Sequence, residues 1–458
     1  MLFKKTKRIN LNGMDCLLMA FDYHMRKNGF AGNLAQIVLG LPVQISESEI
    51  TNRISSLMEQ FPIIHAVSKR HFFSRLPCWE MDPGHRSGFP RITVFHLEEK
   101  TEENPEFRTL KKKLFNLPLQ PEKGEQIRFD LVYFGKGGME IYMTWVHALM
   151  DAHGAEYFLS MIGNPDLEKE ALMVESHRMA KFSRSDTGSD KNPVSETGNT
   201  DDKWKKAKRS FDHIDRIALN PPVSILSKFP EKAKPLQEYW IMTFTREETK
   251  AVLDLARKRC GFFNESTCFA ASAMCELKQL YKKKRVLSDN YVLSLPVNLR
   301  KKGTHLPVFS NQSTSLLYSF TSENLLDFDS AVRHFKEQTH RAIKTGLLDA
   351  NVVVMEISKF LPTWFYIRKV RQAMKGEIAS IVMANPGTMY SRLSEFMGTP
   401  VDYVNHMPTI IAPPGIGVLF YQFAGRLNIT FVYTEGILSQ EEQNGFQQGI
   451  RNHLLNGK

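Results

Sequence analysis

The segment from Trp145 to Gly154 holds the residues best suited to chemistry in this chain. His147 follows an apolar run that predicts a strand, Asp151 comes four residues later, and residues 155–161 predict a helix. A neutral histidine at a strand end can project a ring nitrogen into a cleft and take a proton from a nucleophile. The alternative is a buried, hydrogen-bonded histidine beside a helix N-terminal aspartate. The spacing alone leaves both interpretations open.

The same segment resembles the H-x-x-x-D-G active-site motif of the coenzyme-A-dependent acyltransferase superfamily. That superfamily includes chloramphenicol acetyltransferase, plant BAHD acyltransferases, condensation domains and bacterial wax ester synthases. Other segments resemble elements of these enzymes in the same order: residues 59–65 the N-terminal His-Pro element, 294–300 the strand-borne V-D-x-R element, 309–312 the G-N segment, 384–387 the N-x-P-G turn, and 415–433 the last strand pair. The likeness extends over essentially the whole chain.

The chain also departs from the family pattern at several positions. Ala152 stands where the family has glycine, and Val146 stands where condensation domains have the first histidine of a pair. The D-F-G-W-G signature of the plant enzymes is absent. These differences leave the subfamily open.

The resemblance implies a role for each of the residues that match the motifs. His147 would be the general base for an acceptor hydroxyl or amine, which attacks an acyl thioester in a tunnel between two lobes, without an acyl-enzyme. Asp151 would be structural and paired with Arg300. Asn311 is the candidate oxyanion donor, with Ser313 and Thr314 as alternatives.

No bound cofactor or metal is expected. The thioester of coenzyme A or of an acyl carrier protein would be a co-substrate. His153 could join His147 and Asp151 as a metal ligand, but no second ligand cluster supports this. The sequence contains neither G-x-S-x-G nor H-E-x-x-H, so serine hydrolase and zincin chemistry are excluded.

The elements that must position these residues alternate between strands and helices. In the first part of the chain we expect strands at 34–41, 63–67 and 92–97, a helix at 14–26, a second helix after a capping box at 46–49, and a hairpin of 127–134 with 139–146. In the second part we expect strands at 240–244 and 291–297, a capping box at 245–248, helices at 269–281 and 330–343, and a hairpin of 415–423 with 427–433.

A polar segment from about residue 183 to 209 contains almost no apolar residue and divides the chain. We expect an N-terminal lobe at 1–182 with the H-x-x-x-D motif, a linker or mobile crossover loop at 183–235, and a C-terminal lobe at 236–458. The fold class is α/β with α+β character: two chloramphenicol-acetyltransferase-like lobes, each a mixed sheet with flanking helices.

Composition limits the partners. The formal charge of +11 favours anions, but the basic clusters lack the aromatic interleaving of a nucleic-acid reader. An acyl carrier protein or a peripheral membrane contact fits better. The five cysteines form no C-x-x-C pair and no apolar run reaches about 18 residues, which predicts a cytoplasmic protein.

Thirty-one phenylalanines, and methionines near His147, suggest an apolar tunnel and lipid-like substrates. We therefore expect an acyltransferase, wax ester synthase-like, that acylates an alcohol or amine. The alternative is a non-catalytic binding or scaffold protein with the same fold.

Overall fold

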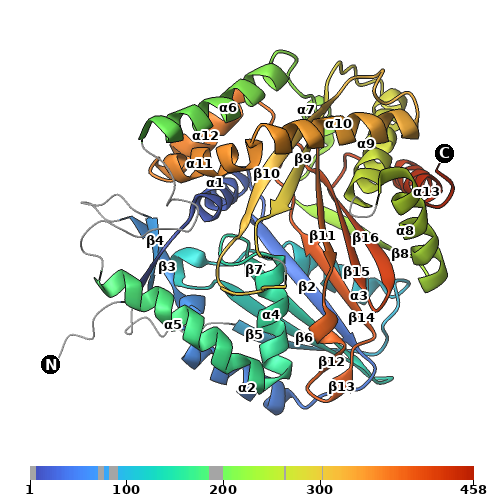
Figure 1. The fold of residues 1–458 in the computed structure, drawn as a ribbon. Coiled ribbons are helices and arrows are strands. Elements are labelled where there is room, and N and C mark those ends of the chain that lie inside the picture. The colour runs from blue at the N-terminus through green and yellow to red at the C-terminus, as the bar shows by residue number, and fades with distance from the viewer. Residues whose placement is uncertain are drawn as a thin grey trace.

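The computed structural model describes residues 7–70, 77–81, 91–184, 200–261, 265–301 and 303–457 (Figure 1). The helices are α1 (Gly13–Lys27), α2 (Glu47–Gln60), α3 (Pro105–Phe115), α4 (Ala152–Gly163), α5 (Glu168–Arg184), α6 (Thr200–Ala218), α7 (Ile225–Lys228), α8 (Arg246–Cys260), α9 (Glu265–Lys283), α10 (Phe328–Lys344), α11 (Leu347–Ser358), α12 (Thr363–Ala373) and α13 (Gln440–Asn456).

The strands are β1 (Lys7–Asn10), β2 (Leu34–Leu41), β3 (Val67–Arg70), β4 (Pro77–Met81), β5 (Arg91–Leu97), β6 (Ile127–Phe134), β7 (Met139–Val146), β8 (Gln237–Thr243), β9 (Tyr291–Asn298), β10 (Ser313–Phe320), β11 (Ile381–Thr388), β12 (Glu395–Phe396), β13 (Thr399–Pro400), β14 (Tyr403–Pro408), β15 (Ile416–Phe423) and β16 (Arg426–Thr434). Most of these strands belong to two large sheets. Small sheets, β1-β4-β3 and β12-β13, lie outside the larger pair.

The first large sheet has the strand order β14-β2-β7-β6-β5. Strands β2, β6 and β7 are buried along their whole lengths, which explains why their sequences are nearly continuous apolar runs. The β6–β7 hairpin has the predicted bounds and pairs Ile127 with Trp145. This sheet therefore fixes the strand end from which His147 follows.

The second large sheet has the order β10-β9-β11-β15-β16-β8, with β11 parallel to both of its neighbours. Figure 1 shows α8, α9 and α13 beside this sheet, and their apolar faces share one core with its strands. The Thr245 capping box at the start of α8 forms as predicted, with Glu248 bonding back to the Thr245 backbone. Each large sheet is thus mixed and flanked by helices, and the predicted α/β class with two lobes is confirmed.

Several local expectations differ from the structure. Residues 62–65 form a 3-10 turn instead of the start of a strand, because Pro62 fixes the backbone there and only Val67 onward pairs with β4. Ser46 precedes α2, but its side chain makes no capping bond. It is instead 2.8 Å from the Ser48 hydroxyl.

The segment expected to be a linker at 183–235 contains α6, which packs along α11, and α7. Residues 185–199 of that segment lie outside the described residues. The strand β14 lies in the C-terminal half of the chain, yet it pairs with β2 of the first sheet. The boundary between the two lobes is therefore not a single point in the sequence.

Among the described residues, no helix combines the length and the apolar character needed to cross a membrane.

Candidate active site

His147 lies in a tight turn directly after β7. Its backbone N–H donates to the carbonyl oxygen of Asn33 at 3.0 Å, and the Leu149 N–H donates to Val146 at 2.9 Å. The Trp145 indole closes the turn by donating to the carbonyl of Met150 at 3.0 Å. These bonds hold the backbone, while the half-buried imidazole lines a mostly apolar cavity.

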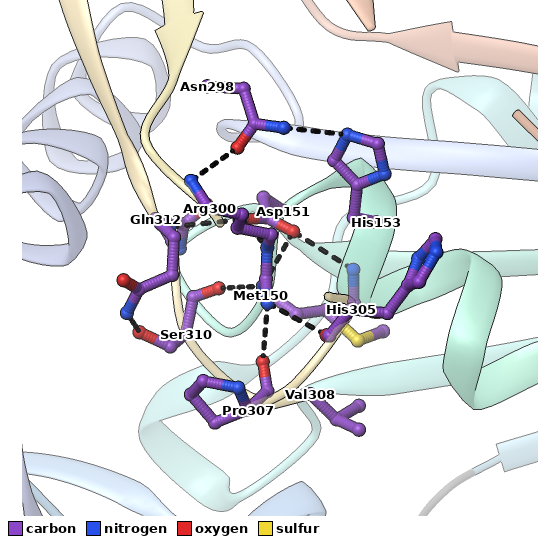
Figure 2. Close-up of polar contacts among 12 residues, drawn as sticks. Met150, Asp151, His153, Asn298, Arg300, His305, Pro307, Val308, Ser310 and Gln312 are labelled. Atoms are coloured by element: carbon purple, nitrogen blue, oxygen red, sulfur yellow. Dashed lines mark hydrogen bonds and ion pairs between the residues drawn. The ribbon is translucent and has the colours of Figure 1, made fainter. Parts of the chain in front are cut away.

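Asp151 is the N-cap of α4 and accepts a hydrogen bond from the backbone N–H of Gly154 at 2.9 Å. It also accepts from the Gln312 backbone N–H at 3.0 Å. The Arg300 guanidinium completes the set with two bonds, from Nε at 3.0 Å and from Nη2 at 2.9 Å. The carboxylate is therefore fully engaged in holding structure, as Figure 2 shows.

Arg300 is itself held on all sides. Besides Asp151, its N–H groups donate to the carbonyl oxygens of His305 at 2.7 Å, Pro307 at 3.0 Å and Ser310 at 3.1 Å (Figure 2). Its side chain is only 1% exposed. The pair thus brings together residues 149 positions apart and binds the 301–312 loop to the start of α4. The resemblance implies this pairing of Asp151 with Arg300, and the positional role that it implies for the pair stays a prediction.

Asn311 is not placed as an oxyanion donor. Its side-chain Nδ2 donates to Asp15 at 2.9 Å and to the carbonyls of His147 and Ala148 at 3.1 Å each. It is buried and does not line the cavity. The prediction for Asn311 is therefore corrected: this amide supports the backbone of the His147 turn, and its N–H groups are already used.

Asp15 is a hydrogen-bond partner of Asn311 that the sequence did not predict. Its carboxylate accepts from both the backbone and the side chain of Asn311, and it also forms the capping box of α1 with Asn12. Burial raises the pKa of Asp15 to about 6, opposed by these hydrogen bonds. Its capping-box spacing with Asn12 was the only local signal for it.

The cavity has a volume of about 400 Å³, within the range of small-molecule sites. Most of its lining is apolar. The residues come from both sheets and from helices α1, α6, α11 and α12, and include Leu17, Phe21, Ile214, Val354, Met355, Val370, Ile378, Val382, Ile410, Val418, Leu419 and Val432. The polar lining residues include His147, His153, His406 and the β10 residues Ser313, Thr314 and Ser315.

Among the alternative oxyanion donors, Ser313 and Thr314 both line the cavity. The Thr314 hydroxyl is buried and makes no hydrogen bond within the part of the chain that the structure describes. A buried hydroxyl without a partner can donate to a charge that develops nearby. Thr314 therefore replaces Asn311 as the better candidate.

Burial lowers the pKa of the His147 imidazole, while its own backbone carbonyl, Asp151 and Asn311 oppose this. Burial therefore favours the neutral form of the ring, which is the form that can accept a proton. A second histidine, His406 on β14, also lines the cavity. Its Nδ1 is 2.6 Å from the Tyr390 hydroxyl, and burial lowers its pKa to about 3. No sequence signal pointed to His406, because it is isolated within a short strand.

His153 is grouped with Glu156 and His305, not with His147 and Asp151. Potential ligand atoms of these three residues lie within 4.8 Å of one another. Asn298 uses its oxygen to accept from the Arg300 backbone at 2.9 Å, so its Nδ2 faces His153 Nε2 at 3.1 Å. The other ring nitrogen, Nδ1, makes no hydrogen bond within the part of the chain that the structure describes.

Electrostatics in this cluster favour neutral groups. Burial raises the pKa of Glu156 to about 7, although the Arg392 charge and backbone N–H groups around Ser391 oppose it. Burial, followed by the positive charge of Arg392, lowers the pKa of His305 to about 4. The cluster is therefore a polar contact between α4 and the loop that contains His305. Within it, the Glu156 carboxyl gains or loses a proton near neutral pH.

No protein-family model and no curated protein sequence matches the chain. Solved structures do match its fold. A trichothecene 15-O-acetyltransferase from Fusarium sporotrichioides is 12% identical, with a TM-score of 0.67 over 98% of this chain and 95% of its own. The first condensation domain of the calcium-dependent antibiotic synthetase, in complex with a substrate analogue, is 13% identical, with a TM-score of 0.62 over 98% and 97%.

The starter condensation domain of rhizomide synthetase, solved as a mutant with C8-CoA and Leu-SNAC, is 11% identical, with a TM-score of 0.59 over 98% of this chain and 94% of that one. These proteins share the two-lobed architecture across nearly the whole of both chains. The protein therefore has the same fold as these acetyltransferase and condensation-domain structures, as the sequence resemblance predicted.

Proposed function

We propose that this protein is an acyltransferase that moves an apolar acyl group from a coenzyme A or carrier-protein thioester to an alcohol or amine. The observation that carries the proposal is the neutral His147 ring on the wall of a mostly apolar cavity of about 400 Å³. The shared fold supports it, since the neighbours include an O-acetyltransferase and a condensation domain solved with C8-CoA.

In this mechanism His147 removes the proton from the acceptor hydroxyl or amine as that group attacks the thioester carbonyl carbon. The negative charge that develops on the carbonyl oxygen is stabilised by a hydrogen bond, for which the Thr314 hydroxyl is the candidate. Collapse of the tetrahedral intermediate expels the thiolate, which recovers the proton from His147. Asp151 and Arg300 take no part in proton transfer and maintain the turn that carries His147.

The test is release of free thiol from long-chain acyl-CoA in the presence of a mixed panel of alcohols and amines, with the acylated product identified by mass spectrometry. His147→Ala should lower turnover by about 10²- to 10⁴-fold without unfolding the protein. His340→Ala, which removes an exposed histidine on α10, is the matched control and should keep full activity.

Undiminished transfer by His147→Ala would contradict the role of His147. Acyl-CoA binding without any thiol release by the unmodified protein would instead assign the non-catalytic binding role.

A further inference from the structure

Four large aromatic side chains are exposed on neighbouring helices. Trp204 and Phe211 on α6 are 60% and 47% exposed, Phe360 between α11 and α12 is 46% exposed, and Trp364 in the first turn of α12 is 53% exposed. We call these four residues the aromatic face. Large aromatic side chains are normally buried, and exposed groups of them mark sites of interaction.

The helices that carry the aromatic face lie together. α6 packs along α11 and also contacts α12, and Figure 1 shows the three helices at one end of the molecule. Trp204 and Phe211 are seven residues apart, or about two helical turns, so both project from the same flank of α6. Trp364 packs against the Phe365 ring, with centroids 5.5 Å apart, at the start of α12.

The apolar cavity reaches this same surface. Phe211 lines the cavity and is also 47% exposed, so it stands where the cavity meets solvent. Across from α6, the cavity wall is formed by Lys369, Val370 and Ala373 of α12, and Lys369 is exposed. Of the aromatic face, Phe211 therefore lies where the wall of the cavity beside His147 reaches the surface, and the other three residues lie on α6, on α12 and just before α12.

Positive charge accompanies the aromatic residues. α12 contains Arg368, Lys369 and Arg371 and no acidic residue. Lys208 is exposed on α6, one turn from Trp204 and from Phe211. Exposed tryptophan and phenylalanine beside lysine and arginine are the combination that binds the interface of a bilayer with anionic headgroups. An acidic protein would satisfy the charges, but it would not by itself explain four exposed aromatic side chains on the helices where the apolar cavity reaches the surface.

We propose that the aromatic face docks on the surface of an anionic bilayer and holds the cavity entrance against the lipid. An apolar substrate then passes from the bilayer into the cavity without crossing water. The proposed docking is inferred from the exposed aromatic and basic residues alone. The passage of substrate into the cavity rests in addition on the proposed acyltransferase function.

Docking is tested by co-sedimentation of the full chain with vesicles of phosphatidylcholine alone or mixed with phosphatidylglycerol. We expect binding to the mixed vesicles and little to phosphatidylcholine. The double variant Trp204→Ser/Trp364→Ser should bind at least about tenfold more weakly, since it removes two interfacial anchors. Lys208→Gln/Arg368→Gln should lose about fivefold for each charge.

The matched control is Leu287→Ser/Leu326→Ser, which changes side chains that are 88% and 74% exposed outside the aromatic face. It should bind like the unmodified protein. Tryptophan emission gives a second readout. Trp79 and Trp145 are buried, and the half-buried Trp240 is stacked on Phe431, so a blue shift on vesicles should come mainly from Trp204 and Trp364 and should be largely lost in their double variant.

Absence of vesicle binding, or equal losses in the aromatic and control variants, would overturn the proposal. Binding of an acidic protein with no binding to vesicles would overturn it as well. His147→Ala should bind vesicles normally, because docking does not use the imidazole. A failed acyl-transfer assay thus leaves the docking result independent.

Discussion

At the scale of single residues, the contact between Asp151 and Arg300 has an energetic signature. Both side chains are largely buried, so removing one partner leaves the other charge without compensation. Asp151→Asn and Arg300→Met should each lower the free energy of unfolding by up to about 3–5 kcal/mol. The double variant should be less destabilised than the sum of the two, since no orphan charge remains. Chemical denaturation measures all three, and additive losses would contradict the structural role of the pair.

Glu156 gives a second residue-scale prediction, which concerns pH. Burial raises its folded-state pKa from 4.5 to about 7, so the folded protein binds this proton more tightly than the unfolded chain. The contribution of Glu156 to the free energy of unfolding therefore falls as the pH rises from about 4.5 to about 7, by roughly 3 kcal/mol at most. Glu156→Gln should be more stable than the unmodified protein at about pH 8 and nearly equal at about pH 4.5.

Denaturant titrations at the two pH values would measure this difference. Glu337→Gln, an exposed change on α10, is the control and should show no pH-dependent gain. A Glu156→Gln variant that is less stable than the unmodified protein at the higher pH would show that the charged carboxylate stabilises the fold.

At the scale of elements, the first turn of α4 packs against the backbone of the Arg300 loop. A Cβ at Gly154 would overlap the carbonyl oxygen of Val308. Replacing glycine by alanine inside a helix normally stabilises it by about 1 kcal/mol. Gly154→Ala should instead destabilise the protein by about 1–3 kcal/mol, because backbone atoms cannot move aside easily.

Gly445 on α13 provides the matched comparison, because a Cβ there would meet no atom within 4 Å. Gly445→Ala should raise the melting temperature while Gly154→Ala lowers it. Equal gains at both positions would mean that α4 can shift away from Val308.

The elements that sequence reasoning predicted best are those whose signal is local. The bounds of β2, β6 and β7 follow from buried apolar runs, and the α8 capping box follows from Thr245 and its spacing to Glu248. The missed elements lack such a signal. β14 is only six residues long and is interrupted by Asn405 and His406, and α6 is so rich in charge that it resembles a linker.

The same distinction applies to the site. His147 and Asp151 belong to one local motif, and Arg300 was found only because the family resemblance linked a distant segment to it. The hydrogen-bond partners of the Asn311 side chain could not be predicted, because they depend on which carbonyl groups the fold brings within reach. Asp15 and His406 are likewise brought to the site by long-range packing alone.

At the scale of the whole molecule, the two large sheets should unfold together. β14 belongs to the first sheet, and the chain continues from it directly into β15 of the second. The ion pair of Asp151 and Arg300 couples the two halves again. Calorimetry should therefore show one transition whose calorimetric and van't Hoff enthalpies agree. Two resolved transitions would contradict this coupling.

The passage of the chain from β14 to β15 also restricts how the lobes can move. The connecting residues, 409–415, include Thr409, Ile410, Ile411 and Pro414 of the cavity wall, so one side of the cavity is a covalent strap. The cavity cannot widen freely on the side where residues 409–415 join the two sheets covalently. If the cavity opens, we expect the smallest displacement at this covalent connection and a larger one on the opposite side of the cavity.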